Sequence, residues 1–442
     1  MYSAVSATAA ATSDANRLNI SLEPKVDSNK LAAAAVRGAL AVALLSALLL
    51  GARPAHAQTI NDLYNPPEYG DPLGTGSLAG LVADGAGNFY GTTNNGGLYQ
   101  SGMVFEVSPN GSGGWNGTTI YTFGSGGADD GSEPGYGPLL LDNAGNLWGT
   151  TESGGANGYG AVFELSPAGG GNWTETTIYS FTGGTYNYDP INGLIMDSSG
   201  NLYGTTLNSS GGGVLSSGAV YELSPSDGAW TEQIIYAYPR GNRAGLTMDY
   251  AGNIYGLGSV GDQPTIYELS QNHFGEWVPT VLFTFPASSP DYGPQGTLAL
   301  DKELNLYGTT FGNNKKSLGA VFELIPPNNR KSKKQWTKKV LHSFQGEATG
   351  DGAKPYAGVT LDKSGNIYGT TAFGGSGNYG AVYELFNYGD GSYGEAVLAN
   401  TGDASGIAPY GAVILDSAGN VYGATAYGGS YNLGIVYEVT NN

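Results

Sequence analysis

Seven glutamates recur at one place in a repeated sequence pattern, and carboxylates are common general acids and bases. They are Glu106, Glu164, Glu222, Glu268, Glu323, Glu384 and Glu438. A catalytic pair needs carboxylates in unequal surroundings, so that their pKa values differ. Seven equivalent copies do not provide this asymmetry. We therefore interpret them as hydrogen-bond acceptors for strands or turns of a neighbouring repeat, and we predict no catalytic residue.

Seven aspartates recur in the pattern D-x-x-x-N-x-[YW]-G. They are Asp84, Asp142, Asp197, Asp249, Asp301, Asp362 and Asp416. Most copies read D-x-x-G-N, in which Asp can cap a tight turn and Gly takes the positive φ. The pattern lacks the alternating ligands and the final bidentate Glu of an EF-hand loop. It therefore predicts turn caps, and we expect no metal and no cofactor.

Other catalytic signatures are missing from the sequence. There is no cysteine, and the three histidines are His56, His273 and His342. His342 replaces a strand aromatic (LHSF against IYSF), which predicts a packed strand residue, and His273 falls in a turn. No H-x-x-x-H, G-x-S-x-G or P-loop motif occurs. An enzyme would need inner-strand residues that converge on a central channel, as in propeller lyases and lactonases, and this alternative rests on fold analogy alone.

The recurrent residues must be positioned by a repeated element. Successive aspartates of the pattern are 58, 55, 52, 52, 61 and 54 residues apart. Each unit holds four strand signals, in the second unit 139–141, 146–151, 161–165 and 178–181. A period of this length indicates a propeller or a solenoid, and solenoid coils are usually shorter. We predict an all-β, seven-bladed β-propeller of four-stranded antiparallel blades, with a β-solenoid as the alternative. One aromatic at the start of each fourth strand is expected between blades: Trp115, Trp173, Trp230, Trp277, Trp336 and Tyr393.

The two ends of the repeat array complement each other. The last unit stops after its third strand, at 435–439, and a spare strand, 60–64, precedes the first unit. We therefore predict that the N-terminal strand of the mature chain closes the last blade and protects its edge. Removing it should strongly destabilise the fold.

Residues 1–57 differ in kind from the repeats. An apolar run of 14 residues, 38–51, is followed by Ala55-His56-Ala57. This is short for a membrane span and resembles a signal-peptide core with its cleavage site, although a retained anchor is the alternative. The polar segment before it is long, which a true start near Leu31 or Val36 would explain. We predict a signal peptide over 1–57, one propeller over 58–442 without a membrane span, and export to the periplasm, cell surface or medium.

Tandem copies of GNLYGTT followed by GAVFEL carry a family resemblance. The segments 145–151 with 160–165, and 365–371 with 380–385, show it most clearly, and it extends over 75–442. The chain resembles the GloVer tandem-repeat proteins, which are exported bacterial proteins grouped as "choice-of-anchor". The resemblance implies export and surface association, and it implies no established activity.

Function is expected in the loops, because they vary between units. Aromatic, amide and acidic loop residues would suit a neutral carbohydrate, which binds by stacking and directional hydrogen bonds. The alternative is that they are ordinary solvated loop residues. The candidate ligand-binding residues are Asn94, Tyr99, Asp130, Tyr159, Asp291, Asp351, Tyr379 and Tyr427. We predict a monomeric binding module for a neutral polysaccharide or a cell-envelope component, with an extracellular polysaccharide lyase or hydrolase as the alternative.

Charge adds one further candidate surface. The chain carries a net charge of −19, which argues against nucleic acid as a partner. Basic residues gather in one hairpin of the fifth unit, at Arg330, Lys331, Lys333, Lys334, Lys338 and Lys339. The hairpin is either a solvated turn or a docking patch for an anionic envelope polymer.

Overall fold

The structure is a computed structural model, in which Ala55–Asn442 forms one compact unit. It describes residues 60–64, 80–184, 189–207, 217–241, 243–289, 292–312, 317–327 and 336–440. The predicted signal peptide lies outside these residues. Within them, no helix has the length and apolar character needed to cross a membrane.

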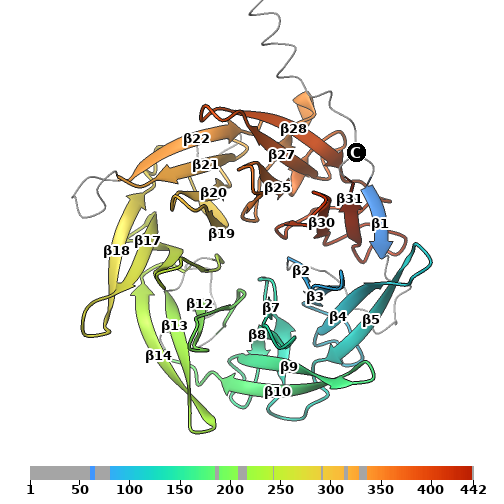
Figure 1. Ribbon diagram of the computed structural model, residues 1–442, viewed down its shortest axis with the longest axis vertical. Helices are drawn as coiled ribbons and strands as arrows, with labels where there is room; N and C mark the ends of the chain where they lie inside the picture. Colours follow the sequence, from blue (N-terminus) through green and yellow to red (C-terminus); the bar gives the residue numbers. More distant parts are fainter. Residues whose placement is uncertain are drawn as a thin grey trace, which may run out of the picture. The chain divides into compact units, whose positions relative to one another are not determined.

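The described residues form seven antiparallel blades that surround a central opening (Figure 1), and one further sheet of two short strands. In six blades the strands follow the chain from the centre to the rim, and in the last blade the outermost strand comes from the N-terminal end of the repeat array. This confirms the predicted all-β, seven-bladed propeller. Blades are short because each unit supplies brief apolar runs separated by Gly-containing turns.

Strands of the same rank occupy equivalent places in the blades. The first strands are β2 (Val82–Ala83), β7 (Leu140–Leu141), β11 (Ile195–Met196), β15 (Thr247–Met248), β19 (Pro294–Leu300), β24 (Thr360–Leu361) and β29 (Ile414–Leu415). The second strands are β3 (Phe89–Thr93), β8 (Leu147–Gly154), β12 (Leu202–Leu207), β16 (Ile254–Val260), β20 (Leu306–Thr310), β25 (Ile367–Thr371) and β30 (Val421–Ala424).

The outer two ranks are longer. The third strands are β4 (Met103–Pro109), β9 (Ala161–Gly169), β13 (Gly218–Ser226), β17 (Gln263–Gln271), β21 (Ala320–Ile325), β27 (Ala381–Asn387) and β31 (Val436–Val439). The fourth strands are β5 (Trp115–Thr122), β10 (Asn172–Ser180), β14 (Ala229–Tyr238), β18 (Trp277–Thr284), β22 (Thr337–Ser343), β28 (Tyr393–Asn400) and β1 (Ile60–Tyr64). The connections add β6 (Gly131–Pro134), β23 (Gly352–Ala353), β26 (Phe373–Gly374) and the 3₁₀ helix η1 (Glu347–Thr349).

The N-terminal strand closes the ring as predicted. β1 pairs antiparallel with β31, and Ile60 faces Val439 in the register. The two ends of the chain's repeat array therefore share one blade, in which β31 has a partner on both sides. Closure removes the exposed edge that an incomplete blade would present to other chains.

The core lies between the blades. Seven clusters of buried apolar side chains each join two neighbouring blades, and the one between the last and first blades contains Leu63 of β1. The six aromatics expected at the starts of fourth strands each belong to or pack against one of these clusters, as predicted. Burial of apolar side chains between sheets therefore holds the ring together.

Candidate functional site

The recurrent aspartates organise the turn between the first and second strands. The Asp142 carboxylate accepts hydrogen bonds from the backbone N–H of Ala144 and Asn146, from the Asn146 amide and from Trp148 Nε1, at 2.8–3.0 Å. A Tyr hydroxyl replaces the indole in the matching sets at Asp84, Asp197, Asp249 and Asp416. Burial alone would raise the pKa of Asp142, but these hydrogen bonds bring it below its usual value. The turn-cap prediction is confirmed for these residues.

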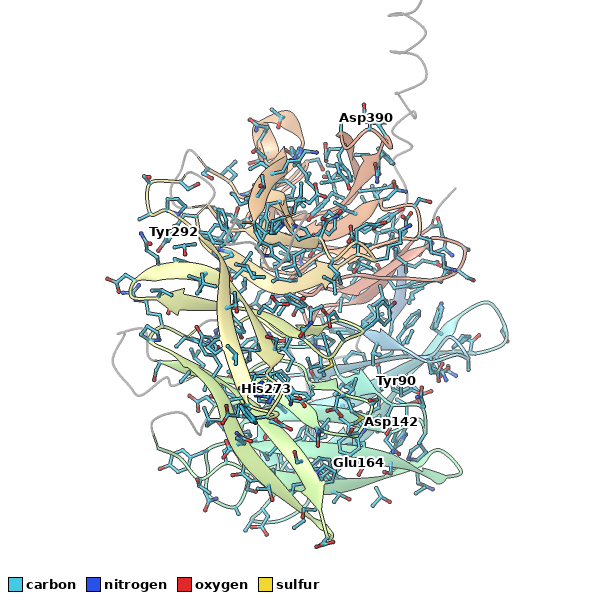
Figure 2. The ribbon with its side chains drawn as sticks, turned by 60° about the vertical axis from the view of Figure 1, so that its left-hand side comes forward. Tyr90, Asp142, Glu164, His273, Tyr292 and Asp390 are labelled. Carbon is cyan, nitrogen blue, oxygen red and sulfur yellow. The ribbon has the colours of Figure 1, made fainter. Side chains whose placement is uncertain are left out.

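The recurrent glutamates accept hydrogen bonds, partly from their own blade. Tyr368 donates to Glu384 and Tyr422 donates to Glu438, both at 2.8 Å across paired strands. Trp277 Nε1 donates to Glu222 of the preceding blade at 2.9 Å. The prediction of a partner in a neighbouring blade therefore holds for Glu222, whereas the other two bonds stay within one blade. In Figure 2, Asp142 and Glu164 lie within one blade, among its packed strands.

Small residues form the wall of the central channel. A Cβ added to Gly137 would lie 1.8 Å from the backbone nitrogen of Gly193 in the next blade. Threonine side chains of the second strands then bind backbone carbonyls of the next blade, as Thr150 does to Asn192 at 3.0 Å and Thr370 to Gly411 at 3.0 Å. Close backbone contact therefore fixes the positions of the residues just before each first strand.

The residues just before the first strands line a cavity of about 600 Å³ in the channel. Its wall is mostly Gly, Ala and short apolar side chains from the blades. Larger polar and aromatic side chains stand six residues before the recurrent aspartates of their blades: Tyr136, Arg243, Gln295, Tyr356 and Tyr410. This volume falls in the range of about 300–1,000 Å³ that is typical of small-molecule sites.

The cavity is chemically asymmetric although its wall is repetitive. The guanidinium of Arg243 lies 4.3 Å from the centroid of the Tyr136 ring. On another part of the wall, the rings of Tyr356 and Tyr410 meet edge to face at 5.1 Å. Burial, together with Tyr356 and Tyr427, raises the pKa of Tyr410, so its phenol stays protonated at neutral pH. The cavity therefore offers aromatic faces, phenol hydroxyls and one cation.

The described loop residues among those predicted to bind ligand lie outside the cavity wall. The rings of Tyr99 and Tyr159 cover the glycines Gly124 and Gly183, which follow the fourth strands of their own blades. The Asp130 carboxylate, 7% exposed, accepts hydrogen bonds from the N–H groups of Gly124 and Gly126. These contacts give the three side chains a structural role in the loops.

The other predicted loop residues are scattered. Asn94 donates a hydrogen bond to the carbonyl of Pro134 at 3.3 Å, and Tyr379 and Tyr427 are exposed. Tyr427 lies near Tyr410, while Asp351 is buried beside His342. Asp291 lies outside the described residues. The cavity residues share no motif. They could have been found in the sequence only as the position six residues before each recurrent aspartate, where the residue type varies among the units.

Only part of the basic hairpin is described. Arg330, Lys331, Lys333 and Lys334 lie outside the described residues. Lys338 points between blades, with its Nζ 5.4 Å from the centroid of the Phe285 ring, and burial lowers its pKa to about 8. Lys339 Nζ donates to the carbonyl of Gly391 in the next blade. The docking patch stays a prediction.

His342 has polar neighbours that its place in the repeat did not indicate. It is half-buried on β22 and its ring meets Phe344 edge to face at 4.9 Å, as expected of a packed strand residue. Its Nε2 also lies 3.1 Å from Asp351 Oδ2. The repeat pattern did not indicate this contact, because Asp351 lies in the connection after the strand.

The fold and the cavity define a seven-bladed propeller with a ligand-sized space in its channel. The sequence matches the Gloeobacter/Verrucomicrobia repeat over residues 67–264 and 244–442, and the chain belongs to this family. No curated protein matches the chain in sequence. The predicted resemblance is thereby confirmed.

Solved propellers resemble the chain in fold. A puromycin hydrolase is 10% identical over 80% of this chain and 50% of that chain, with a TM-score of 0.51. An ulvan lyase of polysaccharide lyase family 25 is 11% identical over 84% of this chain and 96% of that chain, with a TM-score of 0.47. An α-L-arabinanase from Penicillium chrysogenum is 14% identical over 68% of this chain and 91% of that chain, with a TM-score of 0.42. At these identities the likeness concerns the fold alone.

Proposed function

We propose that this protein is a carbohydrate-binding module whose site is the channel cavity. The observation that carries the proposal is the set of tyrosines on the wall of a space of about 600 Å³. Sugar rings present apolar CH faces and equatorial hydroxyls, so tyrosines can stack against the first and hydrogen-bond to the second. Gln295 and Asn192 add amide groups of matching polarity.

Arg243 extends the choice of ligand. Its exposed guanidinium is the cation of the described cavity wall and can bind a carboxylate through two parallel hydrogen bonds. A saccharide that carries a uronic acid would therefore gain a directed contact that a neutral one lacks. Neutral saccharides would still stack on Tyr356 and Tyr410.

Binding fits the cavity better than hydrolysis or elimination does. Among the described residues that line it there is no carboxylate and no histidine, so a pair of acids for glycoside hydrolysis is not supplied there. A lyase would need a strong base near the sugar C5 proton. Tyr356 and Tyr410 are poor candidates, because burial raises their pKa values.

The same proposal places the protein outside the cytoplasm. The apolar run 38–51 with its following Ala-His-Ala has the form of an export signal. An exported propeller would meet extracellular or envelope polysaccharides. We propose that the protein acts as a monomer.

Glycan-array binding followed by calorimetry tests the site. We expect Tyr136→Ala and Tyr410→Ala each to weaken binding at least about tenfold, equivalent to about 1.4 kcal/mol. Tyr159→Ala and Tyr379→Ala, which remove exposed aromatics outside the cavity, serve as matched controls and should bind as the unaltered protein does. Loss of binding in the controls alone would move the site to the loops.

Arg243→Gln then separates the two ligand classes. It should weaken binding of uronic-acid glycans and leave neutral glycans unchanged. If the unaltered protein binds no glycan, the proposal of a carbohydrate site is wrong.

A further inference from the structure

One position of the fourth strands mediates contact between neighbouring blades. A residue near the end of one fourth strand faces a residue near the start of the next. Tyr179 donates to Glu232 at 3.1 Å in this way, and Lys338 lies 6.0 Å from the centroid of the Phe283 ring. The pairs are Tyr64 with Gly117, Tyr121 with Glu175, Tyr179 with Glu232, Phe283 with Lys338, and His342 with Glu395. Among these five interfaces, two hold Tyr with Glu and the other three each hold a different pair.

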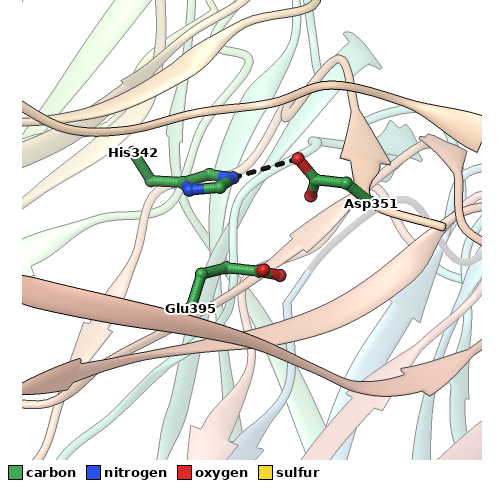
Figure 3. Close-up of side chains that lie close together, drawn as sticks. All are labelled: His342, Asp351 and Glu395. Carbon is green, nitrogen blue, oxygen red and sulfur yellow. Dashed lines mark hydrogen bonds and ion pairs between the residues drawn. The ribbon is translucent and has the colours of Figure 1, made fainter. Parts of the chain in front are cut away.

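At the interface between the fifth and sixth blades this position brings together a histidine and two carboxylates. His342 belongs to β22, Asp351 to the connection that follows it and Glu395 to β28. One ligand atom from each lies within 4.8 Å of the others, and Figure 3 shows the three side chains converging. Two of the atoms, His342 Nε2 and Asp351 Oδ2, are 3.1 Å apart.

The three groups are held in place by their surroundings. Asp351 is 7% exposed, and its oxygens accept hydrogen bonds from the N–H groups of Gln345 at 2.7 Å and Gly352 at 2.6 Å. These bonds fix the carboxylate while leaving it lone pairs for another partner. The His342 ring is oriented by its contact with Phe344. Fixed ligands of this kind favour metal binding because little order is lost when the ion enters.

Glu395 supplies an independent observation. Its Oε1 is buried and accepts no hydrogen bond from any described residue. Burial of a carboxylate oxygen without a partner is costly. Burial and the nearby Asp351 both raise the pKa of Glu395, while His342 opposes them. A cation between the three groups would satisfy the free oxygen and compensate both carboxylates.

We propose that His342, Asp351 and Glu395 bind one Zn²⁺ ion that joins the fifth blade to the sixth. One imidazole nitrogen and two carboxylate oxygens, with a water as the fourth ligand, make a set that suits Zn²⁺. Ligands about 2.1 Å from zinc in tetrahedral geometry lie roughly 3.4 Å apart, so the observed spacing requires only a small closing movement of a side chain. The imidazole disfavours Ca²⁺ and Mg²⁺, which prefer sets of oxygen ligands.

The chain contains a counterpart of this site without a histidine. Between the first and second blades, Tyr121 stands where His342 does, with Asp130 and Glu175 as the acidic partners. A phenol that stays protonated is a hydrogen-bond donor rather than a metal ligand. His342→Tyr should therefore replace the zinc site by a group of one tyrosine and two carboxylates, like that of Tyr121, and the protein should still fold.

Calorimetric titration of Zn²⁺ into chelator-treated protein without a histidine tag tests the proposal. We expect one ion per chain, a higher midpoint of thermal unfolding with Zn²⁺, and visible absorption typical of a tetrahedral site with Co²⁺. His342→Tyr and Glu395→Gln should each lose at least about tenfold in affinity and lose the thermal shift. His273→Ala removes the histidine of an exposed turn and should bind as the unaltered protein does.

Circular dichroism shows whether each variant is folded, so that a loss of binding can be assigned to the site. The proposal is overturned if the unaltered protein does not bind Zn²⁺ saturably. It is equally overturned if folded His342→Tyr and Glu395→Gln bind as tightly as the unaltered protein. In either case His342, Asp351 and Glu395 form a contact between blades made by side chains alone.

Discussion

At the residue scale, hydrogen-bond donors determine what each carboxylate does. Asp142 and its counterparts accept hydrogen bonds from backbone, amide and indole or phenol donors, so their carboxylate oxygens are satisfied within the turn. Glu395 has a buried oxygen that accepts no hydrogen bond from the described residues. Residues of one chemical type thus become architecture or candidate ligands according to the donors around them.

Asp142→Asn tests the turn role at this scale. The amide cannot accept from Asn146 and Trp148 in the same way, because its NH₂ faces their donors. We expect a loss of about 1–3 kcal/mol in the free energy of unfolding at pH 7. The pKa of Asp142 is lowered in the folded protein, so its stabilisation is present above the unfolded pKa and is lost as pH falls through the folded value.

Urea unfolding at pH 7 and pH 3 measures this difference. The gap between the two proteins should narrow at pH 3, because protons then bind this aspartate more readily in the unfolded chain than in the folded protein. Asp129→Asn, at an exposed aspartate, is the matched control and should be close to neutral. A variant gap as large at pH 3 as at pH 7 would contradict the charge-assisted role.

At the scale of elements, the fourth strands carry the differences between blade interfaces. Glu175 of β10 faces Asp130 and Tyr121 of the preceding unit. Burial, and then Asp130, raise its pKa to about 7, while a hydrogen bond from Thr177 and the nearby Tyr121 hydroxyl oppose the shift. This interface therefore includes an acid that is partly protonated near neutral pH.

Glu175→Gln should remove a pH dependence from this interface. Because the folded pKa is raised, the stability linked to Glu175 is full below about pH 4.5 and is lost as pH rises through about 7. After allowance for solvent screening of this half-buried group, we expect the variant to be about 1 kcal/mol more stable at pH 8 and equal at pH 4. Thermal unfolding across this range measures the effect, and Glu303→Gln on an exposed turn is the control. A constant difference at all pH values would refute the linkage.

Repeat spacing was enough to predict the strands but not the site. β1 spans Ile60–Tyr64, the bounds predicted for the spare strand, because its apolar residues and the repeat period are enough to define it. The cavity residue Arg243 has no motif, and its role depends on a backbone approach that only the closed ring creates. His342 and Glu395 meet because the end of one fourth strand faces the start of the next. The spacing of residues within one unit does not predict this contact between units.

At the scale of the whole propeller, stability depends on closure. Each apolar cluster joins two blades, so opening one interface exposes the apolar faces of both blades, and loss of β1 would also leave the edge of β31 unpaired. Figure 1 shows β1 at the rim beside β31, next to the first blade. A strand of five residues thus connects the beginning of the repeat array to its end.

Removing residues 60–64 tests this connection. The truncation exposes the edge of β31 and takes the buried Leu63 out of the cluster between the last and first blades. Leu63→Ala alone should cost about 2–4 kcal/mol, and the truncation should cost more, since it also removes the strand pairing. Asn61→Ala, at an exposed position of the same strand, is the matched control and should change little. Thermal unfolding and light scattering measure the result. We expect a lower midpoint and association through the open edge, and an unchanged midpoint would mean that the ring is stable without its closing strand.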